Sequence, residues 1–204
     1  ILIITNTIPY PLLSGAPLRT YNILRQLSHD NEVYLCALTS LPEHQKGIEH
    51  LRTVCNDVTW AQKKPARIAN IYNKHVPLST PIELRLHYSP DLSRSIRKLT
   101  HRIEFDIIQI EHASMGHYLG SLPKKMQKKS VWLLHDIDFA KFQRLAIIEK
   151  NVILKFRYTI HSVLMRKWMA KFASKFGLCA TVSMNDQLLL NHINKDVEII
   201  VSPN

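Results

Sequence analysis

Titratable side chains follow two apolar segments of this chain, where they could meet a reacting group. Glu111 and His112 close the sequence DIIQIEH, and His135 and Asp136 follow VWLL. A histidine so placed can hydrogen-bond a substrate and stabilise charge that develops as a bond breaks. It can equally close a loop, and most of the eleven histidines in this chain must be structural or simply exposed. Glu111, His112 and His135 are therefore candidates for either role.

A second candidate site lies in the loop after the first apolar segment, where Ser14, Gly15 and Ala16 precede a helix start at Pro17. Free N–H groups at a helix N-terminus favour anions, and a glycine lets a ligand approach the backbone. Arg19, in the first turn, adds a positive charge. An ordinary turn between a strand and a helix explains the same residues. Neither GxGxxG nor GxxxxGK[ST] is present, which argues against a dinucleotide enzyme or a P-loop ATPase.

The cysteines and acidic residues do not form a familiar metal motif. Cys36, Cys55 and Cys179 are far apart in the sequence, which predicts small buried hydrophobic residues in a reducing compartment rather than a disulfide or a metal site. The segment 136–138 matches a DxD pattern in its letters only. No metal is expected.

Apolar segments alternate with helical patterns along the whole chain. Runs without a period of two predict strands covered on both faces, as in a parallel sheet. The predicted strands are residues 1–5, 32–38, 58–60, 106–111, 131–134, 178–182 and 197–201. The predicted helices are residues 17–27, 42–51, 90–99, 115–119, 152–176 and 184–193, with a further possible helix through Ile68, Ile71 and Tyr72.

This alternation predicts one α/β domain with a doubly wound, mainly parallel, Rossmann-like sheet of about seven strands. Ligands of such sheets bind at the carboxyl ends of the strands. The candidate loops are therefore residues 5–16, 111–116, 135–139 and 183–185. Ser183 belongs to the last of these loops and also resembles the start of a capping box.

The charge is strongly positive: 27 Lys and Arg face 16 Asp and Glu, which gives a formal net charge of +11. Phosphate ligands, nucleic acid and acidic lipid headgroups all suit this charge. Nucleic acid is disfavoured because no aromatic residues alternate with the basic ones. No apolar run reaches the roughly 18 residues that span a bilayer.

The predicted helix 152–176 combines apolar and basic residues, so two interpretations remain open. It could lie on anionic lipid, or it could face the core with a solvated basic side, which is the simpler interpretation. Its basic residues are Lys155, Arg157, Arg166, Lys167, Lys171 and Lys175.

Several segments, taken in order, resemble the N-terminal half of family 4 glycosyltransferases, which have the GT-B fold of two Rossmann-like domains facing across a cleft. These segments are PYPLLSGAPLRTYNILRQL, HDNEVYLCAL, HVPLSTPIELRLHYSPDL, DIIQIEHASMGHYL, VWLLHDIDF, LCATVSMND and IIVSPN. The resemblance covers nearly all of residues 1–204. It implies a single N-terminal, acceptor-side domain, with the nucleotide-sugar-binding C-terminal domain absent from this chain.

The resemblance also assigns roles to the candidate residues. It implies that His135 is the catalytic histidine and that Ser14, Gly15 and Ala16 lie near the donor phosphates, although many relatives have a second glycine where this chain has Ala16. Glu111 and His112 would meet the acceptor. The remaining predicted substrate-binding residues are Arg19, Asp136 and Ser183.

The implied function is that of a retaining glycosyltransferase, which transfers a hexosyl group from a nucleotide-sugar to a polysaccharide, a glycolipid or a related acceptor. The nucleotide-sugar is a substrate, and no cofactor is expected. The resemblance favours bacterial cell-envelope assembly in the cytoplasm, with peripheral attachment to the inner face of the membrane as one possibility. Residues 1–204 alone would be inactive. The rival hypothesis is a non-catalytic Rossmann-like module that binds a phosphorylated or nucleic-acid ligand.

Overall fold

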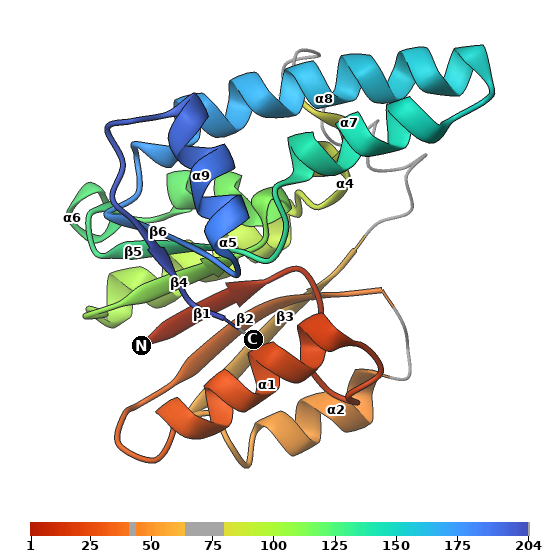
Figure 1. Cartoon of the computed structure of the whole chain (residues 1–204). Coiled ribbons are helices and arrows are strands. Elements are labelled where there is room, and N and C mark those ends of the chain that lie inside the picture. Colours follow the sequence, from red (N-terminus) through yellow and green to blue (C-terminus); the bar gives the residue numbers. More distant parts are fainter. Residues whose placement is uncertain (41–43, 64–79, 204) are drawn as a thin grey trace.

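The computed structural model describes residues 1–40, 44–63 and 80–203. Its centre is a seven-stranded sheet in which all neighbouring strands are parallel, in the order β3-β2-β1-β4-β5-β6-β7 (Figure 1). The doubly wound, Rossmann-like fold predicted from the sequence is confirmed. The strands are β1 (Leu2–Thr5), β2 (Tyr34–Thr39), β3 (Asp57–Gln62), β4 (Ile108–Glu111), β5 (Ser130–Leu134), β6 (Leu178–Thr181) and β7 (Ile199–Val201).

Helices cover both faces of this sheet. Leu24 of α1 and Leu51 of α2 pack with Ile3 and Leu35 on one face, while α5, η1 and the C-terminal half of α8 cover the other. The helices are α1 (Gly15–Leu27), α2 (His44–Leu51), α4 (Ile82–Leu86), α5 (Pro90–Arg102), the 3-10 helix η1 (Ala113–Ser121), α6 (Lys124–Gln127), α7 (Asp138–Ile148), α8 (Val152–Ala173) and α9 (Met184–Ile193).

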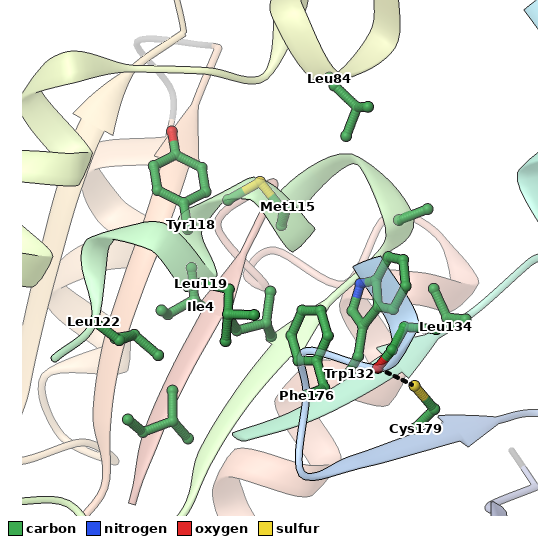
Figure 2. Close-up of a cluster of buried hydrophobic side chains, with 14 of the residues drawn as sticks. Ile4, Leu84, Met115, Tyr118, Leu119, Leu122, Trp132, Leu134, Phe176 and Cys179 are labelled. Carbon is green, nitrogen blue, oxygen red and sulfur yellow. Dashed lines mark hydrogen bonds between the residues drawn. The ribbon is translucent and has the colours of Figure 1, made fainter. Parts of the chain in front are cut away.

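The larger core cluster is built around Trp132 of β5 (Figure 2). Its indole stacks on Phe176, with 4.8 Å between ring centroids, and Met115 and Tyr118 of η1 are fully buried in the same cluster. Aromatic rings bury large apolar areas, so this cluster contributes strongly to stability. It fixes β4 and β5, the two strands that end at the candidate histidines.

All three cysteines are free and buried, as the sequence predicted. Burial raises the pKa of Cys36, Cys55 and Cys179 to about 12. Each thiol therefore stays protonated and packs as a small apolar side chain.

Four local predictions need correction. Helix α7 was not predicted, and it begins at Asp138, inside the expected loop 135–139. Residues 124–127, which lie between the predicted elements 115–119 and 131–134, form the short helix α6. Helix α8 ends at Ala173, three residues before the predicted end. The predicted helix at 115–119 is 3-10. The possible helix through Ile68, Ile71 and Tyr72 lies outside the described residues.

Gly177 was expected to end the long helix, but the structure gives it another role. No glycine has a positive φ among the described residues. A Cβ atom at Gly177 would lie 2.0 Å from the carbonyl oxygen of Lys128. Glycine is needed here because two backbone segments pass one another too closely for any side chain.

Candidate functional site

The candidate site lies where the strand order reverses, between β1 and β4. In open α/β sheets this reversal leaves a crevice at the carboxyl ends of the strands, and ligands bind there. Glu111 is the last residue of β4, and His135 directly follows β5. The structure brings these two predicted residues together, since Glu111 Oε2 lies 3.6 Å from His135 Nε2.

Glu111 is a fully buried carboxylate with a donor on each oxygen. Thr20 Oγ1, on α1, donates to Oε2, and Gln109 Nε2 donates to Oε1 at 2.8 Å. Burial by itself raises the pKa of Glu111. The His135 imidazole, the Thr20 hydroxyl and the nearby His112 outweigh burial and hold the pKa below its ordinary value. Glu111 is therefore an anion at neutral pH.

His112 stacks on His135, with ring centroids 4.2 Å apart and 20° between the planes. Burial, followed by the neighbouring His135, lowers the pKa of His112 to about 4. His112 is therefore neutral at physiological pH. His135 is one-tenth exposed, so it retains access to solvent or to a ligand.

The backbone at His112 has an unusual conformation, with φ 68° and ψ 147°. Residues other than glycine rarely adopt this backbone conformation. Strained residues of this kind are found most often at functional sites. Two hydrogen bonds hold the strained residue: His112 N donates to Leu133 O at 2.8 Å, and Trp132 Nε1 donates to His112 O at 3.1 Å. The buried indole therefore fixes the position of this imidazole.

A small pocket of about 150 Å³ opens beside these histidines. Asp136, which was predicted to bind substrate, lines this pocket together with His112. Burial, followed by repulsion from Glu83, raises the pKa of Asp138 to about 7. The polar lining of the pocket includes Asn6, His87, His112, Asp136, Asp138 and Lys141.

His87 and Lys63 belong to this region but were not predicted from the sequence. His87 Nδ1 lies 2.8 Å from Glu83 O, and His87 Nε2 lies 2.9 Å from Lys63 Nζ. A carbonyl oxygen only accepts, so Nδ1 carries the proton and Nε2 accepts from the ammonium group. His87 is therefore neutral, and burial, followed by the positive charge of Lys63, lowers its pKa.

Ser14, Gly15 and Ala16 lie at the start of α1, and they differ in exposure and in what surrounds them. Ser14 is the N-cap residue, but its side chain makes no capping hydrogen bond. A Cβ atom at Gly15 would meet nothing within 4 Å, so the protein itself does not require glycine there. Gly15 lines a cavity of about 530 Å³ along α1, together with Arg19 and Ser202. The half-buried Ala16 does not line it.

Arg19 and Ser183, both predicted to bind substrate, are engaged within the chain. Arg19 Nη2 donates to Ser202 O at 2.7 Å and to Ser202 Oγ at 3.1 Å, so this guanidinium holds the end of the sheet. Ser183 Oγ donates to Asp186 Oδ2 at 2.6 Å and accepts from Asp186 N at 3.1 Å. That pair forms the N-terminal cap of α9.

Glu111, His112 and His135 together could also hold a metal ion, since one ligand atom from each lies within 4.8 Å of the others. Imidazole and carboxylate ligands suit zinc. Each Glu111 oxygen accepts one hydrogen bond, from Thr20 or from Gln109, and keeps a second lone pair that could face an ion. The sequence-based expectation of no metal stays a prediction.

No family model matches this chain, and no curated protein matches it. Among solved structures, it is similar to sucrose-phosphate synthase from Thermosynechococcus elongatus, with a TM-score of 0.60 and 10% sequence identity. The similarity covers 99% of this chain and 47% of that structure, so the chain spans about half the length of its structural neighbour. At this identity the likeness shows the fold alone: the chain has the α/β, Rossmann-like fold of one half of a GT-B protein.

Proposed function

We propose that this chain is the acceptor-side half of a retaining glycosyltransferase that uses a nucleotide-sugar donor. The observation that carries the proposal is the contact between His135 and the buried Glu111 carboxylate, at the reversal point of a sheet that matches a GT-B half. A polar group held rigidly at such a crevice is already oriented for a reacting centre.

In the proposed reaction, the bond between the anomeric carbon and the donor phosphate breaks, and an acceptor oxygen forms the new glycosidic bond. The nucleoside diphosphate leaves with the bonding electrons, and its departing oxygen takes the proton that the acceptor hydroxyl loses. His135 hydrogen-bonds the transferred sugar and stabilises the charge that develops. Glu111 is a positioning residue, because it is fully buried and orients His135.

The other candidate residues have supporting roles in this proposal. Gly15 and the first turn of α1 offer backbone N–H groups to the donor phosphates, since no residue that the structure describes crowds Gly15. Asp136 and His112 line the small pocket and contact acceptor hydroxyl groups. Arg19 acts indirectly, by holding Ser202 beside the larger cavity.

The finer assignments rest on the resemblance of the sequence segments quoted above. They are family 4, hexosyl transfer, a polysaccharide or glycolipid acceptor, and bacterial cell-envelope assembly. The second half of the enzyme supplies most of the nucleotide-sugar site in this proposal. Residues 1–204 alone should therefore fold but show no transfer activity, because donor and acceptor need both halves for alignment.

The test is sugar transfer by the full-length gene product carrying His135→Ala. We expect turnover to fall about a hundredfold, as for the loss of one transition-state hydrogen bond at a charged centre. His101→Ala, an exposed histidine on α5, is the matched control and should keep normal turnover. Near-normal turnover of the His135 variant would make that histidine structural. Nucleotide binding without any transfer would support the non-catalytic binding module instead.

A further inference from the structure

Helices α7 and α8 form a hairpin that projects from the body of the domain (Figure 1). At its end, five large apolar side chains are between 64% and 78% exposed. We call these residues the apolar tip: Ile147, Ile148, Val152, Ile153 and Phe156. Scattered exposed apolar residues are ordinary, but a contiguous group marks an interaction surface.

The two halves of α8 differ in their packing. Met165, Met169 and Ala173 in the C-terminal half are fully buried in the larger core cluster. The N-terminal half packs mainly along α7, where Phe142 lies against His161 with ring centroids 4.1 Å apart, and His161 Nε2 also lies 3.8 Å from Glu83 Oε2 on α4. The apolar tip therefore projects beyond the core that anchors the hairpin.

The turn of the hairpin is ordered by its own hydrogen bonds. Asn151 Oδ1 accepts from Ile153 N and Leu154 N and so caps α8. Glu149 Oε1 accepts from Asn151 N at 2.9 Å. These bonds hold the ends of both helices, and with them the apolar tip, in one arrangement.

Positive charge is concentrated on the same hairpin. Residues 141–175 contain nine Lys and Arg but a single acidic residue, Glu149. Three of these cations, Lys150, Lys155 and Arg157, lie next to the apolar tip and are exposed. We call these three the tip cations.

We propose that the apolar tip and the tip cations dock this protein on the surface of an anionic lipid bilayer. Aliphatic side chains flanked by Lys and Arg match the boundary between acyl chains and negatively charged headgroups. A second copy fits poorly, because the two hairpins would bring like charges together. Nucleic acid also fits poorly, because Phe156 is the one aromatic residue of the apolar tip and bases stack on aromatic rings.

The sequence alone left lipid contact open along the whole of residues 152–176, whereas the apolar tip lies at the N-terminal end of this helix. Lys171 and Lys175 are exposed, as expected for a basic face, but they lie on and just after the half of α8 whose apolar residues enter the core. Lys175 Nζ lies 4.3 Å from the Phe172 ring centroid. In the C-terminal half, Val163 is the one exposed large apolar residue, at 48%, so the cations there have no contiguous apolar group beside them. No helix among the described residues has both the length and the apolar character to cross a bilayer, so the proposal is for surface binding.

The test is binding of the purified protein to vesicles of phosphatidylcholine with and without phosphatidylglycerol, measured by co-sedimentation. We expect binding to the mixed vesicles at low salt, and about tenfold weaker binding after Ile153→Ser with Phe156→Ser. The matched control is Met184→Ser with Leu188→Ser, on α9, whose side chains are exposed to a similar extent, 64% and 62%. It should bind like the wild type.

The electrostatic part has its own comparison. Changing the three tip cations to Gln should weaken binding about tenfold or more at low salt and have little effect at high salt, where charges are screened. The same charge change at Arg25, Lys46 and Arg52, on and next to α1 and α2, is the control and should have little effect. Thermal unfolding of every variant checks the fold, which exposed substitutions should leave intact.

Three results would overturn the proposal, and none depends on transferase activity. The first is a wild type that ignores anionic vesicles at low salt. The second is equal loss of binding in tip variants and controls, which would show attraction to the net charge alone. The third is a wild-type dimer that the apolar-tip variant separates, without vesicle binding, which would make the tip an interface between copies.

Discussion

His112 and His135 lie face to face, with 4.2 Å between their ring centroids, although they come from the ends of two different strands. A proton on both rings at once would be costly at this separation. The buried Glu111 carboxylate lies 3.6 Å from His135, so a buried anion faces one of the two stacked rings. The pair therefore combines one imidazole held neutral with one supported by an anion.

The strained backbone at His112 predicts an inverted order of stability. His112→Gly should be more stable than His112→Ala by about 1 to 2 kcal/mol, because glycine alone adopts this φ without strain. Both variants should lose turnover because both lack the imidazole. Urea unfolding measures the difference. Lys98→Gly and Lys98→Ala, within α5, should show the usual order, in which alanine is the more stable.

Glu111→Gln should both weaken the fold and lower activity. A glutamine side chain presents an amide donor to Thr20 or Gln109, so one buried hydrogen bond is lost, at a cost of about 1 to 3 kcal/mol. Turnover should fall about tenfold or more, because His135 loses the buried anion that positions it. Glu49→Gln, exposed on α2, is the control.

The pH dependence gives Glu111 a second readout. Its pKa lies below the ordinary value of 4.5, so the folded state binds this proton more weakly than the unfolded state does. The ionised carboxylate makes its full contribution to the unfolding free energy above pH 4.5. That contribution is lost as the pH falls through the lower pKa of the folded state. The gap in unfolding free energy between wild type and Glu111→Gln should therefore shrink on acidification. A constant gap would assign the effect to packing.

Asp138 should behave in the opposite way. Its pKa rises from 3.8 to about 7, so its stabilising contribution is present below 3.8 and is lost as the pH rises through about 7. Asp138→Asn should stabilise the protein above that pH by about 2 to 4 kcal/mol and should do little in acid. Melting temperatures across this range measure the effect. Parallel profiles for wild type and Asp138→Asn would refute the prediction.

Two glycines test the close approach of backbone segments. Gly177→Ala should destabilise the protein by about 2 to 4 kcal/mol, because its Cβ atom would collide with the carbonyl oxygen of Lys128. Gly120→Ala should change stability by no more than about 0.5 kcal/mol, because nothing lies within 4 Å of that Cβ position. Denaturant midpoints measure both, and equal values would show that the Lys128 segment can move aside.

The five central strands, β2, β1, β4, β5 and β6, could be predicted because their buried, unalternating apolar runs are local features of the sequence. Helix α7 was missed, although Phe139, Phe142 and Ala146 have helical spacing and are buried. The adjacent Ile147 and Ile148 obscured that spacing, since they are apolar but exposed. Periodicity identifies a helix only when its apolar residues all face the core.

The candidate site was predictable in part. The ends of β4 and β5 must meet at one edge of a parallel sheet, which placed Glu111 near His135. Thr20, by contrast, reaches Glu111 across 91 residues of sequence. Lys63 and His87 likewise become partners only through the packing of separate elements. Such contacts depend on the tertiary structure, so no local pattern signals them.

The hydrogen bonds from Arg19 to Ser202 join residues 183 positions apart. They connect the first helix of the domain to the segment that follows its last strand. The direction in which the chain leaves β7 is therefore set by a side chain of α1. Arg19→Ala should displace the segment after β7 more than it alters the sheet itself.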